Sequence, residues 1–384
     1  MGSLRDTPGA LLCVVGARPN YMKMAPLLRA FRAHAALPAA VLVHTGQHYD
    51  PMLNDRLFED LALPRPDINL GVGSGTHALQ TAEVMRRFEP VLDEQRPSCV
   101  VVVGDVNSTL ACSLVAVKKG IAVAHVEAGL RSYDRTMPEE INRILTDQIS
   151  DFLYTTERAA HGNLEREGIP AERIQFVGNV MIDSLLSHRS HAVPSGETLQ
   201  RAGKEGFGRE GHGVVTLHRP SNVDAPQALS ESLEILRAVS CKLPLVCALH
   251  PRTVARVESF GLSHLLQSER LAVLPPQGYL QMLGLMSGAT LVLTDSGGIQ
   301  EETTALAVPC LTMRENTERP ITVEQGTNTL VGRDLGMILR LVEEVLATGG
   351  KRGRVPELWD GRAAERIASH LQHCLAVRAP ALHG

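Results

Sequence analysis

Acidic side chains between Cys99 and Ser150 occupy positions where α/β enzymes commonly place their chemistry. Asp105 and Glu127 each follow an apolar run that predicts a strand, and Glu139 begins the next predicted helix. In an open parallel sheet, ligands bind in the crevice beyond the carboxyl ends of the strands. We therefore predict that these three carboxylates converge on one catalytic pocket.

Each carboxylate also has a structural interpretation when it is taken singly. Asp105 precedes a predicted helix and could cap it. Glu139 and Glu140 follow Pro138 in a first turn, where the helix dipole favours acidic residues. Glu127 directly follows an apolar strand and is expected to be half buried, which a structural role explains poorly. The occurrence of these acids together at successive strand ends favours catalysis.

A glycine turn in the second half of the chain has the composition of a diphosphate site. In the segment TDSGGIQEE, an apolar strand leads through Ser296, Gly297 and Gly298 into a predicted helix, whose first backbone N–H groups can bind an anion. Glu302 is suited to accept hydrogen bonds from ribose hydroxyls, or is only a favourable first-turn charge. The segment RENTERP adds Arg319 as a cation. Together these features predict a nucleotide site.

Further polar groups stand just beyond other predicted strands. Arg18 and Lys23 flank the turn after the first strand, where a helix N-terminus with nearby cations suits an anion such as phosphate. An ordinary surface turn is the alternative there, because neither a P-loop nor GxGxxG is present. In the second half, His218 and Arg219 follow one strand and His250 follows the next.

The elements that must position these groups alternate regularly between strand and helix. The predicted strands are 11–15, 40–44, 100–103, 122–125, 151–155, 174–177, 214–217, 245–249, 271–274, 291–294 and 310–312. The main predicted helices are 22–33, 76–92, 158–168, 225–239, 254–266, 279–286 and 363–377. Such alternation implies parallel sheets with right-handed crossovers.

Two domains are the default for 384 residues, because a single core of that size is uncommon. We predict an α/β protein with two Rossmann-like domains and a cleft between them. The first domain is expected to span residues 1–180 and to be completed by a C-terminal helix within 362–384. The second is expected to span 181–361 and to bind the nucleotide.

The composition excludes several classes of function. Hydrophobic residues make up 44% and charged residues 21%, as in ordinary globular proteins. The net charge is -4 and aromatic residues make up only 3%, so no nucleic-acid partner is expected. The seven cysteines form no CxxC pair and several lie in apolar runs, which indicates buried thiols in a reducing compartment and no zinc site. Without a membrane-length apolar run or a signal-peptide pattern, a cytoplasmic protein is expected.

Long motifs spread over both halves resemble, in order and spacing, those of the non-hydrolysing UDP-N-acetylglucosamine 2-epimerases. The segments are GARPNYMKMAP, TGQHYD, GDVNSTLA, HVEAGLRSYDRTMPEEINR, TLHRPSNVD, TDSGGIQEE and RENTERP. The resemblance implies a two-domain fold like that of GT-B glycosyltransferases and a homodimer. It also implies interconversion of UDP-GlcNAc and UDP-ManNAc with no cofactor, neither NAD nor metal.

The resemblance further implies a mechanism and roles for particular residues. UDP leaves by anti elimination to give a 2-acetamidoglucal, and then adds back after the other face has been protonated. The positions that match the family's acid/base residues are Asp105, Glu127 and Glu139, and His218 matches an essential histidine near the diphosphate. Nucleotide and phosphate contacts are matched by Arg18, Lys23, Arg143, Ser296, Glu302 and Arg319.

Two departures from the family pattern bear on the substrate. Many relatives have GDT where this chain has Gly104-Asp105-Val106, and many carry a glutamate where this chain has Ser221. The hexosamine therefore stays open, and a UDP-2,3-diacetamido uronic acid is an alternative substrate. A hydrolysing epimerase that releases ManNAc and UDP, a glycosyltransferase and a non-catalytic UDP-sugar sensor also stay open.

Some members of the family are activated by a second UDP-GlcNAc that binds beside the substrate. The resemblance places Gln47, His48 and Arg219 of this chain in the corresponding segments.

Overall fold

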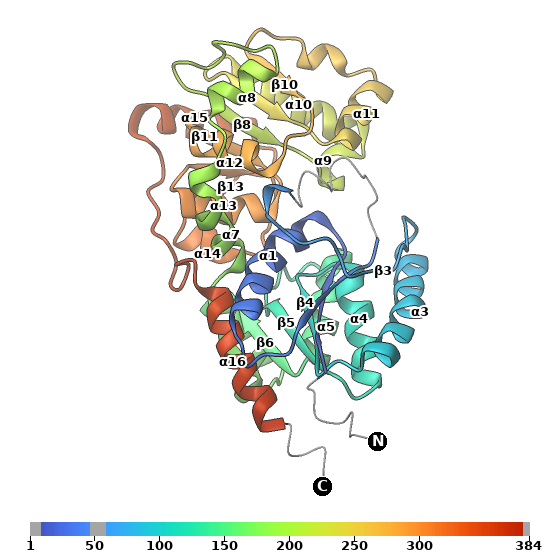
Figure 1. Ribbon diagram of the computed structural model, residues 1–384. Helices are drawn as coiled ribbons and strands as arrows, with labels where there is room; N and C mark the ends of the chain where they lie inside the picture. Colours follow the sequence, from blue (N-terminus) through green and yellow to red (C-terminus); the bar gives the residue numbers. More distant parts are fainter. Residues whose placement is uncertain (1–8, 47–58, 379–384) are drawn as a thin grey trace, which may run out of the picture. The chain divides into compact units, whose positions relative to one another are not determined.

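The computed structural model describes residues 9–46 and 59–378. The chain divides into two compact units (Figure 1). Unit 1 comprises Met1–Ser184 together with Glu357–Gly384, and unit 2 comprises Leu185–Pro356. Each unit contains one parallel β-sheet with helices packed on it, which confirms the predicted α/β class with two Rossmann-like domains. The cleft between the domains stays a prediction.

Unit 1 is built on a seven-stranded parallel sheet with the order β3-β2-β1-β4-β5-β6-β7. Its strands are β1 (Leu11–Val15), β2 (Ala40–His44), β3 (Ile68–Asn69), β4 (Cys99–Val103), β5 (Ala122–Ala128), β6 (Phe152–Thr155) and β7 (Ile174–Phe176). Its helices are α1 (Arg18–Ala33), α3 (His77–Gln95), α4 (Asn107–Lys118), α5 (Pro138–Ile149), α6 (Arg158–Arg166), α7 (Val180–His188), which runs into unit 2, and α16 (Ala363–Arg378).

The central strands of unit 1 are apolar along their whole length because helices cover both faces of the sheet. Every residue of β4 is buried, and Val84, Phe88 and Leu92 of α3 pack in the same core. The strand order reverses between β1 and β4, since the chain first builds β2 and β3 on one side of β1. Such a reversal opens a crevice at the carboxyl ends of the strands, where ligands bind.

Unit 2 has a six-stranded parallel sheet with the order β10-β9-β8-β11-β12-β13, so its reversal lies between β8 and β11. The strands are β8 (Gly213–Thr216), β9 (Leu245–Ala248), β10 (Leu271–Leu274), β11 (Leu291–Thr294), β12 (Cys310–Thr312) and β13 (Asn328–Leu330). The helices are α8 (Ser195–Arg201), α9 (Pro220–Val223), α10 (Pro226–Ser240), α11 (Pro251–Ser259), α12 (Tyr279–Ser287), α13 (Gly297–Leu306), α14 (Pro320–Glu324) and α15 (Leu335–Thr348).

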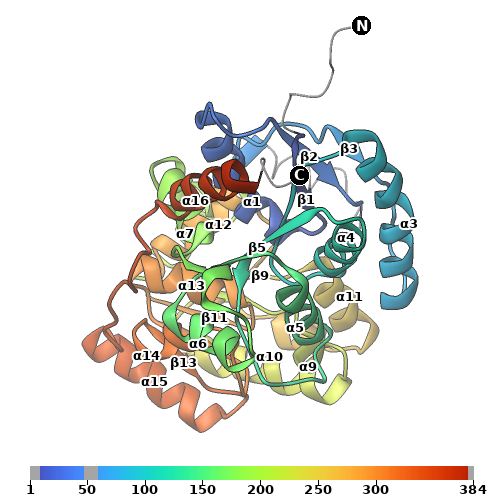
Figure 2. The same ribbon diagram turned by 90° about the horizontal axis from the view of Figure 1, so that it is seen from below.

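Helix α16 returns to unit 1 and lies beside α1 (Figures 1 and 2). Its N-terminus is capped by Asp183 of α7, whose carboxylate accepts the N–H groups of Ala363 and Ala364 at 3.1 and 2.7 Å. Farther along α16, His370 Nδ1 lies 3.1 Å from the Tyr154 hydroxyl of β6. Asp183 therefore links the chain just before unit 2 to the chain just after it.

Several predicted boundaries were wrong, each for a local reason. The predicted helix 254–266 is interrupted, because Gly261 adopts a φ of +70° and a separate 3₁₀ turn, Ser263–Leu266, follows. The predicted strand 122–125 runs on to Ala128 and therefore includes Glu127. The short strands β3 and β13 were not predicted, since a run of two or three residues carries little periodicity.

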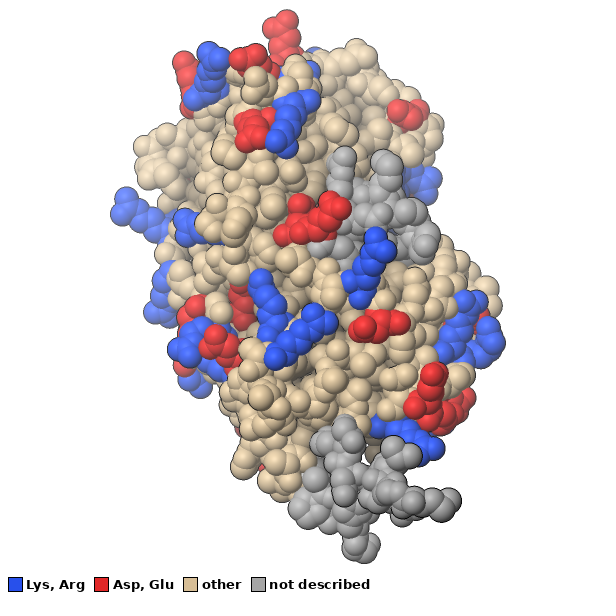
Figure 3. Space-filling model, viewed as in Figure 1, with Lys and Arg blue, Asp and Glu red and all other residues tan. Residues whose placement is uncertain are grey.

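Charge on the face drawn in Figure 3 is mixed, with Lys and Arg side chains interspersed among Asp and Glu. The described residues on that face form no broad basic patch of the kind that binds nucleic acid. Among the residues that the structure describes, no helix is both long and apolar enough to cross a bilayer.

Candidate active site

Unit 1 carries candidate groups at the carboxyl ends of β1, β4 and β5. Lys23 is the sixth residue of α1, and its Nζ is 2.6 Å from Glu127 Oε1. Both side chains are buried, with relative exposures of 6% and 2%. The turn before Lys23 is fixed by Asn20, which accepts the N–H groups of Gly16 and Ala17 and donates to Val103 O. Lys23 therefore reaches Glu127 from a rigid backbone.

Glu127 has an unusual backbone conformation. Its φ of 73° lies in the left-handed region, and the register of β5 against β6 shifts between Val126 and Ala128. For a residue other than glycine this conformation costs about 1–2 kcal/mol. Strain of this kind persists where surrounding contacts hold it, and it is frequent at functional sites. The bulge places the Glu127 carboxylate in the buried contact with Lys23.

Asp105 is not a helix cap. The N-cap residue of α4 is Val106, which makes no side-chain capping bond. The Asp105 carboxylate instead forms an ion pair with Arg143 Nη1, and its backbone oxygen accepts from Asn142 Nδ2 at 2.9 Å. Asp105 remains 22% exposed, whereas the Arg143 side chain is only 3% exposed. This aspartate is therefore held by α5 while keeping access to solvent.

The two glutamates at the start of α5 have different environments. Glu140 is buried and accepts the N–H groups of Ser132 and Tyr133 at 3.0 and 2.8 Å, besides pairing with Arg143. Burial alone would raise the pKa of Glu140, but these hydrogen bonds and the guanidinium hold it below its usual value. Glu139 is partly exposed, and no partner for its side chain is found in the part of the chain that the structure describes. Glu140 is thus structural, and Glu139 stays available for chemistry.

Gly104 joins the two candidate acids. Its N–H donates to Val126 O at 3.1 Å, which links the residue before Asp105 to the residue before Glu127. Gly104 has a φ of +67°, and a Cβ added to it would lie 3.0 Å from Lys23 Nζ. Glycine is required at this position for two separate reasons, since a side chain would be strained and would push against the Lys23 ammonium group.

Unit 2 carries its own candidate groups at the β8 and β11 strand ends. His218 Nδ1 is 2.8 Å from Oδ1 of the fully buried Asp295, while the imidazole itself is 44% exposed. Asp295 also accepts the backbone N–H groups of His218 and Arg219 and a bond from Asn222. Burial would raise the pKa of Asp295, but these donors keep it below its usual value. Asp295 therefore orients the ring of His218 and leaves its Nε2 facing outward.

The glycine turn begins helix α13, as predicted. The Ser296 N–H donates to Thr294 Oγ1 at 3.0 Å and is therefore already engaged. The N–H groups that could bind an anion are those of the residues after Ser296. No side chain caps the helix, and the first N–H groups of a helix have no acceptor within it. Gly297 and Gly298 therefore present backbone N–H groups at the positive end of the helix dipole.

Charged side chains from the RENTERP segment pack directly against this turn. A Cβ on Gly297 would lie 2.5 Å from Arg319 Nη1 and 2.6 Å from Glu318 Oε1. Arg319 also lies 3.0 Å from Glu301, and Glu318 binds Arg314 at 2.8 Å. Burial would raise the pKa of Glu318, but the neighbouring arginines hold it far below its usual range. The acids fix the arginines in place beside α13.

Glu302 is buried on the same helix and lies against the Tyr279 hydroxyl. Burial raises the pKa of Glu302 to about 7, with a lowering from Tyr279 and a further rise from the charge of Glu301. A carboxyl group in this state can accept or donate a hydrogen bond near neutral pH, which suits the recognition of hydroxyl groups.

The remaining predicted residues either contact groups other than the candidate acids or lie outside the residues that the structure describes. His250 is exposed and caps α11, where its Nδ1 accepts the Arg252 N–H at 3.2 Å. Arg219 is partly buried and lies 3.5 Å from Glu318. Gln47, His48 and the side chain of Arg18 lie outside the described residues.

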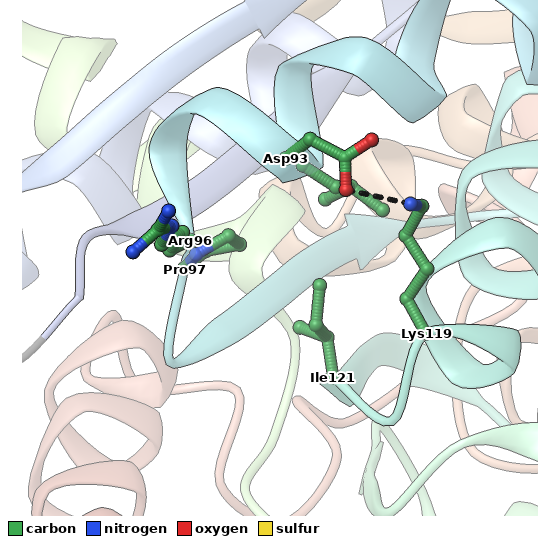
Figure 4. Close-up of a pocket in the computed structure, with 6 residues that line it drawn as sticks. Asp93, Arg96, Pro97, Lys119 and Ile121 are labelled. Atoms are coloured by element: carbon green, nitrogen blue, oxygen red, sulfur yellow. Dashed lines mark hydrogen bonds and ion pairs between the residues drawn. The ribbon is translucent and has the colours of Figure 1, made fainter.

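A pocket in unit 1 lies away from these groups. It is at the amino ends of β4 and β5, whereas the candidate acids follow the carboxyl ends of these strands (Figure 4). Its lining residues are Leu92, Asp93, Arg96, Pro97, Lys119 and Ile121. Lys119 is neutralised by Asp93 at 2.6 Å, so this pocket offers little chemistry. Within the described ranges, no cluster of His, Cys, Asp and Glu could hold a metal ion.

Comparison with known proteins places this arrangement in a family. A family model described as UDP-N-acetylglucosamine 2-epimerase matches residues 30–372. The chain belongs to the UDP-N-acetylglucosamine 2-epimerase family. It is 41% identical over 371 residues to the UDP-N-acetylglucosamine 2-epimerase of Methanocaldococcus jannaschii, covering 94% of this chain and 99% of that protein.

One further epimerase and one solved structure are similar over nearly the whole chain. The UDP-2,3-diacetamido-2,3-dideoxy-D-glucuronate 2-epimerase of Pseudomonas aeruginosa is 40% identical over 366 residues, covering 94% of this chain and 99% of that protein. The crystal structure of Methanocaldococcus jannaschii UDP-GlcNAc 2-epimerase in complex with UDP-GlcNAc and UDP superposes with a TM-score of 0.84 at 40% identity, covering 95% and 99% of the two chains.

The structure of this epimerase-family member adds residues that sequence reasoning did not single out. Asp295 orients His218, and Glu318 fixes the arginines beside α13. Lys23 was predicted as a phosphate contact, and the structure pairs it with Glu127. Asp295 directly follows β11, so its acidic character at a strand end was the available signal. Glu318 stands within the RENTERP segment noted for Arg319.

Proposed function

We propose that this protein is a non-hydrolysing epimerase that interconverts UDP-GlcNAc and UDP-ManNAc. The observation that carries the proposal is that two carboxylates, each held by an ion pair, lie at adjacent strand ends in a chain that belongs to this family. Asp105 is ion-paired with Arg143 and Glu127 with Lys23, and Gly104 connects their backbones. Inversion at C2 requires a base and an acid, and positioned carboxylates serve as both.

In the proposed reaction, one carboxylate of unit 1 removes the C2 proton as the C1–O bond to UDP breaks. This anti elimination gives 2-acetamidoglucal and UDP. A second acid then delivers a proton to the opposite face of C2, and UDP adds back to C1. Asp105, Glu127 and Glu139 are the groups that we assign to these proton transfers.

Unit 2 is proposed to hold the leaving group. The N–H groups of Gly297 and Gly298 and the neighbouring Arg319 favour the negative charge that develops on the diphosphate. His218, oriented by Asp295, directs Nε2 toward the same charge. Glu302 is assigned to the ribose hydroxyls. Because the pathway only moves a proton and UDP, it requires neither a nicotinamide nor a metal.

The decisive experiment is proton NMR of UDP-GlcNAc incubated with the protein in D2O. We expect UDP-ManNAc and UDP-GlcNAc that both carry deuterium at C2. Free ManNAc as the main product would instead identify a hydrolysing epimerase. Binding of UDP-GlcNAc without any exchange at C2 would indicate a sensor or a glycosyltransferase.

Substitution of the acids tests the assigned roles. Asp105→Asn and Glu127→Gln should each abolish exchange at C2, while the affinity for UDP stays close to that of the wild type, because neither residue is assigned to the nucleotide. Isothermal titration with UDP and the D2O assay measure the two properties separately. Wild-type exchange in either variant would remove that residue from the mechanism.

A UDP-2,3-diacetamido uronic acid is the second candidate substrate, because the chain is also 40% identical to the Pseudomonas aeruginosa diacetamido-glucuronate epimerase. The D2O assay on a panel of UDP-hexosamines, with and without a 3-acetamido group and a C6 carboxylate, separates the two. Faster exchange of the diacetamido uronic acid would replace UDP-GlcNAc as the substrate.

We also propose that the protein is a cytoplasmic homodimer. The buried free thiols of Cys13, Cys99, Cys112, Cys247 and Cys310 fit a reducing compartment. Light scattering coupled to size-exclusion chromatography should give twice the chain mass of 41.5 kDa. Cell fractionation tests the compartment.

A further inference from the structure

A buried histidine lies directly behind the candidate acids. His125 belongs to β5 and is 0% exposed. Its Nδ1 is 2.7 Å from Asp147 Oδ1, and its Nε2 is 2.8 Å from the backbone oxygen of Gly104. A carbonyl oxygen only accepts hydrogen bonds, so Nε2 must carry a proton.

The state of Asp147 decides the other nitrogen. Burial would raise the pKa of Asp147, but the charges of His125 and Arg131 hold it below its usual value. Arg131 Nη1, 2.8 Å from Asp147 Oδ2, pairs with Asp147 as a carboxylate. A carboxylate oxygen only accepts, so the 2.7 Å contact with Oδ1 assigns a proton to Nδ1 as well. Both ring nitrogens of His125 are thus engaged, Nδ1 by Asp147 and Nε2 by the Gly104 oxygen.

The other oxygen of Asp147 extends this arrangement. It accepts the Gly129 N–H at 3.0 Å and lies 2.8 Å from Arg131 Nη1. Arg131 in turn pairs with Glu167 at 2.6 Å. Glu167 is 28% exposed, whereas the other three side chains of this network are buried. The pairing avoids the large penalty of an unpaired buried charge.

The network holds backbone on both sides of the candidate acids. The Gly104 oxygen bound by His125 belongs to the residue before Asp105. The Gly129 N–H bound by Asp147 lies two residues after Glu127. Between these anchors, Glu127 keeps its φ of 73°. A strained conformation persists only where its surroundings over-determine it, and these two bonds supply that constraint.

We propose that His125 and Asp147 form a positioning ion pair that fixes the spacing between Asp105 and Glu127 and holds Glu127 in its left-handed conformation. The proposal rests on the proposed epimerase function for its catalytic consequence. Neither residue contacts substrate, because both side chains are 0% exposed. Their effect on turnover is exerted through the backbone that carries the acids.

The kinetic test uses Asp147→Asn and His125→Gln, with exchange at C2 of UDP-GlcNAc in D2O as the readout. A displacement of a catalytic group by about 1 Å costs about 100-fold in rate, so we expect a fall in kcat of that order. The dissociation constant for UDP should change little, because the groups proposed to hold its diphosphate, the N–H groups at the start of α13 and Arg319, lie in unit 2. Losses of kcat and UDP affinity in equal measure would indicate only general damage to the fold.

A matched control and a rescue variant sharpen this test. His370→Gln makes the same substitution in unit 1, where the ring bonds the Tyr154 hydroxyl and no candidate acid. It should lower thermal stability without changing exchange at C2. The double variant with His125→Gln and Asp147→Asn leaves no unpaired charge at this pair, so it should exchange faster than either single variant.

Two structural measurements decide the proposal independently of catalysis. Nitrogen-15 NMR of the wild-type protein should show a proton on both ring nitrogens of His125. A crystal structure of Asp147→Asn should show Glu127 with a negative φ. Absence of exchange in the wild type would overturn the proposed function alone. A singly protonated His125 ring would overturn the positioning role. So would variants that exchange C2 at the rate of the wild type and keep the φ of Glu127 unchanged.

Discussion

At the scale of single residues, the candidate site depends on ion pairs that hold its buried and partly buried charges. Glu127 is neutralised by Lys23, Asp105 by Arg143, and Glu318 by its neighbouring arginine side chains. Charges removed from water are tolerated only with such partners, and a partner also fixes where the charge lies. The same contacts that allow the acids to be buried therefore determine their geometry.

Gly104→Ala tests how closely the acids depend on Lys23. The new Cβ would lie 3.0 Å from Lys23 Nζ at a φ of +67°, so we expect Lys23 to move away from Glu127 and the rate of C2 exchange to fall by about 10-fold or more. Gly120→Ala is the matched control, since Gly120 has a φ of +71° and nothing within 4 Å of its Cβ position. Both variants should lose about 1 kcal/mol of stability. Equal activity in the two would contradict the role of Gly104.

Glu302 predicts a pH dependence of stability. Its pKa is raised from 4.5 to about 7 by burial, so the folded protein binds its proton more tightly than the unfolded chain. The stabilising contribution is complete below pH 4.5 and is lost as the pH rises through about 7. Its size is roughly 3 kcal/mol, because one pKa unit corresponds to about 1.4 kcal/mol.

Urea unfolding of Glu302→Gln between pH 4 and pH 9 measures this contribution. The fall in unfolding free energy over that window should be smaller in the variant than in the wild type, by the contribution of Glu302. Asp183, whose pKa is raised by burial to about 6, keeps its own contribution in both. Glu234→Gln makes the same change at an exposed position of α10 and should keep the wild-type profile. If the unfolding free energies of Glu302→Gln and the wild type changed equally with pH, Glu302 would titrate near its usual pKa.

At the scale of elements, no side chain caps the N-terminus of helix α13, and Arg319 packs directly against it. The helix starts at a glycine because a side chain there would occupy the space of Arg319 and Glu318. The residue that can begin this helix is thus limited by the packing of Arg319 and Glu318 against it. The proposed binding of the diphosphate at this terminus depends on the close approach of the α13 backbone to the Arg319 guanidinium.

Gly297→Ala should weaken UDP binding by about 10-fold, or about 1.4 kcal/mol, because its Cβ displaces Arg319. Gly196→Ala is the control, as Gly196 lies on helix α8 with nothing within 4 Å of its Cβ position. That control should stabilise the protein by up to about 1 kcal/mol, since alanine is the better helix former. Calorimetric titration with UDP separates the variants, and unchanged affinity in Gly297→Ala would remove Arg319 from the UDP site.

At the scale of the whole molecule, the two units divide the proposed chemistry. Unit 1 contributes the carboxylates, and unit 2 contributes the helix terminus and cations suited to a diphosphate. Each unit presents its groups at the reversal of its own strand order, which is where parallel sheets bind ligands. A division of this kind predicts that nucleotide binding and proton transfer respond to different substitutions.

Hydrogen exchange with and without UDP tests this division. At a UDP concentration of about 100 times Kd, binding should stabilise the protein by about 2.7 kcal/mol. Protection should be strongest in peptides that contain the start of α13, and Asp105→Asn should show the same pattern. Protection that is strongest around β4 and β5 would contradict the assignment of UDP to unit 2.

The sequence by itself determined the alternation of strands and helices, the parallel sheets, and the positions of Asp105 and the glycine turn at strand ends. These features follow from local periodicity and from short-range geometry, which a single segment contains. The sequence also indicated that His218 follows a strand of the second half.

Only the tertiary structure decided which side chains meet. Lys23 and Glu127 are 104 positions apart, and Asp105 and Arg143 are 38 apart. The left-handed conformation of Glu127 and the double bonding of His125 likewise depend on strands and helices brought together by packing. Nothing in a local segment encodes such pairs, because the free energy that selects them comes from burying distant parts of the chain against one another.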